Sequence, residues 1–562
     1  MTRFARLLLV LYLLPAGAAG AVAQEQVNQQ AVLRDGIDIA IAARLAQDSR
    51  IVSGRPVELT PIRRFYAQRG FQPVWLDAEG SSKASAQGVL AVLREADTEG
   101  LSAADYHLDA IAANLDVATR EERVALDLLL TDAVMKYGTH LRAGRVAPKS
   151  ISIEFSDVKP KAVDAADLVL RASDAADPRA VLAALTPVRP EYAALKDALQ
   201  RYRGLERAGG WPLVPAPQAA KLEPGMRDPA VKALRKRLAV TGEFDGRLDA
   251  KAAQSDIYDP PLRKAVERFQ ARHGLFVDGV VGAFTVSALN VTAAERVGQI
   301  LASLERVRWM PDDFGERYVV VNVPDYTLKA VERGTPVQEM RVIVGTKVRR
   351  TPIFSSAITS IVLNPTWTMP VKLAREDYLP KLLKDPGYLE SHGFSLYASW
   401  APDAPRLDSS RINWKSVGNN IGKMRLRQDP GPQNALGQVK FNIPNGFDVY
   451  LHDTPSREKF DKSVRTFSSG CVRVGKPLEL ADFVLAGNPE WPAERRQQQL
   501  DKGETKTVVL KQPVTVHLLY QTAWVDDAGT VQFREDIYGR DAELLEAVAR
   551  RSGGLQRVAE AR

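Results

Sequence analysis

The segment Ser468-Ser469-Gly470-Cys471-Val472-Arg473-Val474 contains the single cysteine of this 562-residue chain. His452, in Tyr450-Leu451-His452-Asp453-Thr454, stands 19 positions before that cysteine. One thiol cannot form an intrachain disulfide, and a thiol reacts as its thiolate, a form that a neighbouring imidazole favours. One interpretation is a nucleophilic Cys471 with His452 as its base. The alternative is a buried cysteine that packs as a small apolar side chain.

The residues around the cysteine favour the nucleophile. A histidine-led segment followed by Ser-x-Gly-Cys-x-x-x resembles the catalytic signature of the L,D-transpeptidases of bacterial cell walls, which have the YkuD-type fold. Ser469 stands where many members carry a second histidine. The Ser-Ser-Gly-Cys-Val-Arg-Val form is similar to the large multidomain Gram-negative branch, the YcbB type, in which the upstream histidine is the base.

The N-terminal sequence indicates export. Arg3 and Arg6 precede an apolar run, residues 7–14, which is followed by small residues ending in Ala21-Val22-Ala23. This pattern predicts a cleavable signal peptide over residues 1–23 and a periplasmic protein. The alternative is an uncleaved N-terminal inner-membrane anchor, for which the apolar run is short.

Length and composition predict several globular domains. The 562 residues are 45% hydrophobic and 26% charged, with a net charge of +8, and a chain of this length exceeds what one core supports. The basic residues are dispersed and no nucleic-acid-binding motif occurs, so we expect no nucleic-acid partner. An anionic polymer such as peptidoglycan, whose peptides carry free carboxylates, suits the net positive charge.

The first half of the chain is predicted to be helical. Residues 24–208 are rich in Ala, Leu, Asp and Arg, and residues 125–141 place apolar side chains at helical spacing. This part resembles the helical scaffold region of the YcbB-type enzymes. Residues 209–220 are rich in Gly, Pro and Trp and predict a linker.

A small helical module is expected over residues 221–290. Its sequence Asp278-Gly279-Val280-Val281-Gly282-Ala283-Phe284-Thr285 is similar to the peptidoglycan-binding type 1 module. The glycines of this pattern allow a tight loop before the last helix. The alternative is a structural bundle that no longer binds glycan.

The remaining sequence changes from helix to strand. Residues 291–314 predict a connecting helix, residues 315–540 a β-rich catalytic domain, and residues 541–562 a C-terminal helix and tail. Within the catalytic domain, the long irregular insertion at about residues 371–440 resembles the part that caps the active site in YcbB-type enzymes, and we expect it to act as a lid. The predicted fold is therefore a multidomain α+β chain.

The resemblance implies a covalent acyl transfer. Cys471, activated by His452, would attack the carbonyl after the meso-diaminopimelate of a donor tetrapeptide stem and release the terminal D-Ala. A second stem would take the acyl group, giving a diaminopimelate-to-diaminopimelate cross-link. We expect no metal and no cofactor.

The other residues of the signature have supporting roles in this interpretation. Backbone N–H groups at Gly470 and Cys471, together with Tyr450, would stabilise the oxyanion. Arg473 would hold a substrate carboxylate or brace the loop. Ser469 belongs to the same substrate-binding turn, and the side chain or carbonyl of Asp453 would orient the imidazole.

Other outcomes of the same acyl-enzyme stay open at this point. Water as acceptor would make an L,D-carboxypeptidase, and a protein amine would anchor a protein to the wall. A catalytically idle wall-binding scaffold is a further alternative. Peptidoglycan stems and glycan are the expected partners, beside other cell-wall synthesis enzymes, and β-lactams of the carbapenem class are the expected covalent inhibitors. Such an enzyme would contribute to cell shape.

Overall fold

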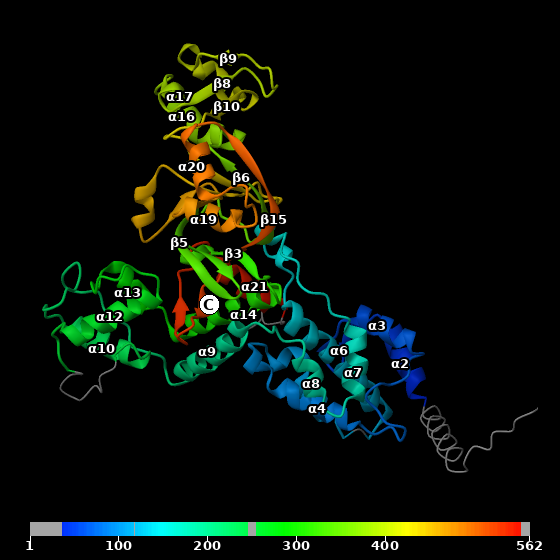
Figure 1. Ribbon diagram of the computed structural model, residues 1–562. Helices are drawn as coiled ribbons and strands as arrows, with labels where there is room; N and C mark the ends of the chain where they lie inside the picture. Colours follow the sequence, from blue (N-terminus) through cyan, green and yellow to red (C-terminus); the bar gives the residue numbers. More distant parts are fainter. Residues whose placement is uncertain (1–35, 117, 245–253, 552–562) are drawn as a thin grey trace, which may run out of the picture. The chain divides into compact units, whose positions relative to one another are not determined.

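The computed structural model describes residues 36–116, 118–244 and 254–551 (Figure 1). The described residues form two compact units, one that ends at Arg145 and also includes Lys161–Pro187, the other made of Val146–Pro160 and the described residues from Val188 onward. The predicted signal peptide, residues 1–23, lies outside the described residues. Within those residues, no helix combines the length and the apolar character that crossing a membrane requires.

The first unit is helical and is organised around one long helix. α6 (Arg120–Ala143) begins at a capping box between Thr119 and Glu122, which satisfies N–H groups of its first turn. It is buried on most of its sides by shorter helices and supplies the largest share of the unit's apolar core. The main surrounding helices are α2 (Ile37–Ala46), α3 (Leu59–Gln68), α4 (Ala84–Arg94), α5 (Leu108–Ala113), α7 (Ala165–Asp174) and α8 (Pro178–Ala183).

A buried carboxylate joins α6 to the segment after α3. Asp127 accepts hydrogen bonds from the backbone N–H groups of Val74 at 3.0 Å and Trp75 at 2.7 Å, and from the hydroxyl of Tyr66. A buried carboxylate is tolerated when several donors satisfy it. Asp127 therefore fixes the aromatic cluster of this unit to its central helix.

The second unit contains a small helical module with its own core. It is built from α10 (Ala230–Val240), α12 (Pro260–Arg272) and α13 (Ala283–Leu289). Asp259 caps α12 by accepting from the Leu262 N–H at 3.0 Å, ahead of prolines in the first turn. In the loop before α13, Gly279 has a φ of 68°, which favours glycine, and its N–H donates to the Gln270 side chain at 2.8 Å.

The β-rich part of the second unit is one sheet that closes on itself. Its order is β13-β5-β14-β12-β11-β6-β15-β3-β4, and β4 also pairs with β5, which gives a barrel-like ring. The strands are β3 (Arg317–Asn322), β4 (Thr327–Glu332), β5 (Thr335–Gly345), β6 (Phe354–Leu363), β11 (Val439–Asn442), β12 (Leu451–His452), β13 (Thr466–Ser468), β14 (Val472–Val474) and β15 (Lys506–Leu519). Alternating burial along β3 and β4 places one face of these strands in the core.

Helices pack against this ring. α19 (Pro477–Leu485), α20 (Ala493–Asp501) and α21 (Arg540–Arg551) contribute apolar side chains to the same core as the strands. α9 (Pro190–Arg207) and α14 (Ala293–Trp309) share a second core with the hairpin of β16 (Ala523–Val525) and β17 (Val531–Phe533). The helical first unit, the helical module and the β-rich sheet confirm the predicted multidomain α+β fold.

The insertion is a small folded subdomain with its own core, although the sequence suggested an irregular excursion. Its four-stranded sheet has the order β7-β10-β8-β9, with β7 (Trp367–Thr368), β8 (Phe394–Tyr397), β9 (Arg406–Leu407) and β10 (Arg425–Gln428). Short helices cover it, including a π-helical turn at Ala374–Tyr378. The strands of this sheet are too short for hydrophobic periodicity to predict them from the sequence.

Candidate active site

Two neighbouring strands bring the signature segments together. β12 and β14 run parallel, with Leu451 opposite Val472 and His452 opposite Arg473. Because side chains alternate along a strand, His452 and Arg473 share one face. Extending the same alternation by two residues places Tyr450 and Cys471 next to them. The sheet thus gathers all four side chains on one surface.

The turn before β14 holds the thiol. Gly470 has a φ of 117°, a conformation that side-chain-bearing residues rarely adopt. Its carbonyl accepts from the Thr351 hydroxyl at 2.8 Å, and its N–H donates to the Ser468 hydroxyl oxygen at 3.1 Å. The Ser468 hydroxyl in turn donates to the Cys471 carbonyl at 2.5 Å. The turn is therefore fixed by its own hydrogen bonds, and the Gly470 N–H is already engaged.

The imidazole of His452 is buried and fixed in one tautomer. Its Nδ1 donates to the carbonyl oxygen of Asp453 at 2.5 Å, since a carbonyl can only accept. This bond leaves Nε2 as the proton acceptor. Burial lowers the pKa of His452 to about 3, and the charges of Arg473 and Lys440 act in the same direction. The imidazole is consequently neutral at physiological pH.

Asp453 orients the imidazole through its backbone. Its carboxylate accepts from the Gln438 N–H at 2.9 Å and from Arg457 at 3.1 Å, while its carbonyl holds His452. Of the two possibilities that the sequence left open for this residue, the geometry corresponds to the carbonyl.

The thiol of Cys471 is desolvated and surrounded by positive groups. Burial raises the pKa of Cys471, whereas hydrogen bonding to Tyr450 and the charges of Lys440 and Arg473 oppose that rise. Burial and the neighbouring Cys471 raise the pKa of the Tyr450 hydroxyl, so it stays protonated and can donate a hydrogen bond. Arg473 has a lowered pKa because it is desolvated, and its buried Nε has no hydrogen-bond partner among the described residues.

Sequence reasoning missed Lys440, which lies beside these groups. It stands on β11 opposite His452, and its Nζ lies 4.2 Å from the centre of the Tyr450 ring. Val439 and Phe441 on either side of it are fully buried. A lysine between two core positions of a short strand was the signal that could have drawn attention to it.

Arg349 was missed as well, and it ties the insertion to the thiol turn. Its guanidinium donates to the Ser469 hydroxyl at 3.1 Å and forms two bonds of 2.6 Å with the carboxylate of Asp377 in the π-helical turn. The insertion also approaches the site through Tyr378, whose pKa of about 12 reflects burial first and is lowered slightly by Arg473. These contacts place the insertion next to the candidate nucleophile.

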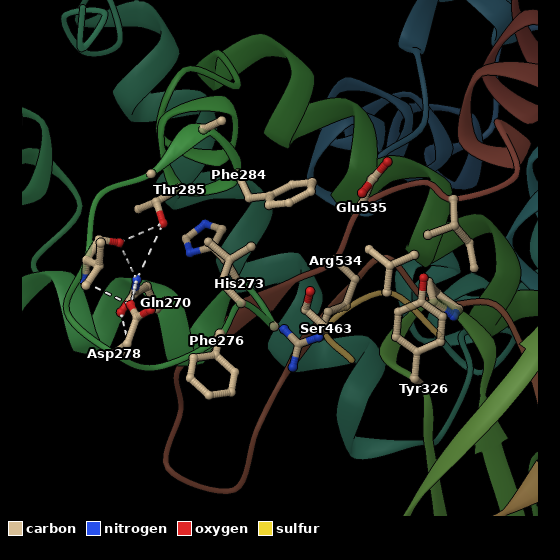
Figure 2. Close-up of a pocket in the computed structure, with 18 residues that line it drawn as sticks. Gln270, His273, Phe276, Asp278, Phe284, Thr285, Tyr326, Ser463, Arg534 and Glu535 are labelled. Carbon is tan, nitrogen blue, oxygen red and sulfur yellow. Dashed lines mark hydrogen bonds between the residues drawn. The ribbon is translucent and has the colours of Figure 1, made fainter. Parts of the chain in front are cut away.

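A second candidate binding site lies beside the helical module (Figure 2). A cavity of about 200 Å³ is lined by residues of the module and by residues of the β-rich domain. Phe276 and Phe284 border it with side chains that are 65% and 70% exposed. Tyr326 reaches it from the β-rich side, and its buried hydroxyl has no hydrogen-bond partner in the described chain. Exposed aromatic faces beside polar groups suit a sugar or peptide ligand.

Comparison with known proteins identifies three regions. Residues 60–199 match a "Scaffold domain", residues 227–289 a "Putative peptidoglycan binding domain" and residues 316–509 an "L,D-transpeptidase catalytic domain". A curated relative from Haemophilus influenzae, named "Putative L,D-transpeptidase", is 37% identical over 246 residues, which cover 44% of this chain. The chain spans about half of that relative's length, 48%.

Two solved structures of L,D-transpeptidases are similar to part of the chain. One, from Xylanimonas cellulosilytica, is 17% identical, with a TM-score of 0.18, and the match covers 54% of this chain and 99% of that one. The other, from Stackebrandtia nassauensis, is 15% identical, with a TM-score of 0.20 and coverage of 53% and 94%. Residues 316–509 thus match the YkuD model of L,D-transpeptidase catalytic domains, and residues 227–289 of the same chain match the peptidoglycan-binding model.

Proposed function

We propose that this protein is a periplasmic L,D-transpeptidase that cross-links peptidoglycan stems through a cysteine acyl-enzyme. The observation that carries the proposal is the shared face of β12 and β14, where a neutral His452 and the Cys471 thiol lie within a transpeptidase domain. A neutral imidazole with a free Nε2 can act as a general base, which is its role here.

In the proposed first half-reaction, Nε2 of His452 takes the thiol proton. Cys471 Sγ then bonds to the carbonyl carbon of the peptide bond that joins meso-diaminopimelate to the terminal D-Ala of the donor. The C–N bond to the terminal D-Ala then breaks, and the imidazolium returns the proton to the leaving amine. The Cys471 N–H and the Tyr450 hydroxyl are the proposed oxyanion donors. Gly470 has a conformational role, because its N–H is bound to Ser468.

In the second half-reaction, the side-chain amine of another stem's diaminopimelate attacks the thioester. Its proton passes to His452, the S–C bond breaks with formation of the new amide, and the imidazolium returns the proton to the Cys471 sulfur. Arg473 is proposed to hold a stem carboxylate, because it is a desolvated cation beside the thiol and its Nε has no hydrogen-bond partner in the part of the chain that the structure describes.

Muropeptide analysis tests this function. Purified protein incubated with tetrapeptide-rich sacculi should produce diaminopimelate-to-diaminopimelate dimers that mass spectrometry detects after glycan digestion. Tripeptides without dimers would identify a carboxypeptidase, a protein adduct an anchoring enzyme, and no change a wall-binding scaffold. The Cys471→Ala protein is the blank for all four outcomes.

The wall module is proposed to bind peptidoglycan at the cavity shown in Figure 2. Phe276→Ser and Phe284→Ser together should weaken sacculus pull-down, because they remove the two exposed aromatic faces beside it. Leu213→Ser, which replaces a residue 64% exposed outside this cavity, is the matched control. Unchanged binding by the double variant would favour a purely structural module.

A further inference from the structure

Lys440 of β11 is a partly desolvated cation. Desolvation lowers the pKa of its ammonium, and the group whose charge opposes this is Cys471. In the described ranges, no Asp or Glu side chain forms an ion pair with Lys440. Withdrawing an ammonium from water without a counter-charge destabilises a fold. Such groups are concentrated at functional sites, where the charge has a task.

The sheet fixes where this charge lies. Lys440 and His452 are directly opposite each other on β11 and β12, so their side chains share the face that carries Cys471. The ammonium sits 4.2 Å from the centre of the Tyr450 ring, a distance typical of a cation–π contact. Tyr450 in turn hydrogen-bonds to the thiol. The aromatic ring therefore holds the cation beside the nucleophile.

The surroundings of the thiol come from several elements. Besides Lys440, they are Tyr450 and His452 of β12, Arg473 of β14, Asp448 before β12, Arg349 after β5, and Asp377 and Tyr378 of the insertion. Among these groups, Lys440 and Arg473 are the cations that lower the thiol pKa. Arg349 is already neutralised by Glu376 and Asp377.

We propose that Lys440 stabilises the thiolate of Cys471 across the face of Tyr450 and thereby sets the pH range in which the nucleophile reacts. Its use in acyl transfer rests on the proposed function. The effect of the Lys440 ammonium on the thiol of Cys471 needs no acyl donor, so it can be measured in the free protein. Lys440 is thus a positioning residue that acts through electrostatics.

Alkylation of the full-length protein by iodoacetamide, followed by mass spectrometry over a series of pH values, tests the proposal. Because the chain has one cysteine, every thiol adduct reports on Cys471. Lys440→Met should raise the midpoint of the rate profile by roughly one pKa unit, which lowers the rate about tenfold below the midpoint. Lys440→Arg should stay near the wild-type profile. Lys506→Met removes an exposed lysine of β15 and should change nothing.

A midpoint that does not move in Lys440→Met would overturn the proposal. A second result would also overturn the proposal: Lys440→Met reacts with neutral iodoacetamide as the wild type does but reacts more slowly with anionic iodoacetate. Lys440 would then act by attracting an anionic ligand. If Lys440→Met fails a thermal-melting check, Lys440→Gln carries the same test. A shifted profile in a protein that makes no cross-links would support Lys440 and reject the proposed function, so the two failures are distinguishable.

Discussion

Arg349 donates a hydrogen bond to the hydroxyl of Ser469 at 3.1 Å while holding Asp377 with two bonds of 2.6 Å. Ser469 lies in the turn that carries Cys471. In this chain the position is used to connect the thiol turn to the insertion, since Asp377 belongs to the π-helical turn.

Replacing Arg349 should separate cross-linking from acylation. Arg349→Ala removes the connection between the insertion and the turn but leaves Cys471 and His452 in place. We expect poor cross-linking of sacculi and near-normal acylation by a small carbapenem, because only the stem needs the insertion for positioning and water exclusion. Arg411→Ala, at an 85% exposed arginine of the insertion, is the control. Equal loss of both activities would show that the insertion builds the catalytic centre.

Cys471→Ala should abolish cross-linking and covalent capture of a carbapenem. The replaced side chain is small, so circular dichroism and thermal melting should match the wild-type protein. Normal turnover by the pure, folded variant would refute the whole mechanism.

His452→Ala should lower acylation by on the order of 10²–10⁴-fold, because general acid–base help is lost at both proton transfers. Short stems and sacculi should be affected alike, since the defect lies in the chemistry. Stopped-flow acylation with a carbapenem and muropeptide analysis provide the two measurements. A defect confined to sacculi would instead assign His452 to substrate positioning.

The pH dependence of acylation follows from the lowered pKa of His452 and the raised pKa of Cys471. His452, with a pKa of about 3, remains a base throughout pH 5–8, and the thiol pKa is raised. Acylation should therefore climb steadily from pH 5 to alkaline pH. A distinct acid limb centred near 6.5, absent from His452→Gln, would contradict this.

The free energy of unfolding should depend on pH in the acidic range, through the protonation of His452. The unfolded chain protonates His452 near the ordinary pKa of about 6.5, whereas the folded chain does so near 3. The unfolded state thus binds more protons between these values, and the free energy of unfolding should fall as the pH drops from 6.5 to 3. His452→Gln should show a shallower fall in urea titrations than the wild type.

Asp127→Ala should destabilise the first unit by roughly 3–5 kcal/mol, because the backbone N–H groups of Val74 and Trp75 would be left buried without an acceptor. Denaturant unfolding of the first unit, followed by tryptophan fluorescence, measures this. Asp109→Ala, at an ion pair that is 86% exposed on the carboxylate side, should change stability by less than about 1 kcal/mol. Comparable losses in both variants would contradict a special role for Asp127.

The sequence predicted what local patterns encode. The helical spacing of residues 125–141 and the β-rich character of residues 315–540 were predictable because these patterns arise from neighbouring residues. Lys440 was overlooked because the pairing register of β11 and β12, which the sequence does not state, places it opposite His452. Arg349 was overlooked because its partner Ser469 is distant in the chain and comes close only through the pairing of β5 with β13. The small sheet of the insertion was hidden for the same reason: β7 pairs with β10 across the whole subdomain.

The closed ring of strands also has a consequence for how the chain acquires its structure. β15 fills the place between β6 and β3, and its Thr515 pairs with Tyr318 almost two hundred positions earlier. Contacts of such separation form late, because the intervening chain must first be brought together. Until Leu519 has been synthesised, β3 and β6 each present an open edge that invites aggregation. The candidate active site on β12 and β14 thus lies on a sheet that becomes complete only once β15 has been made.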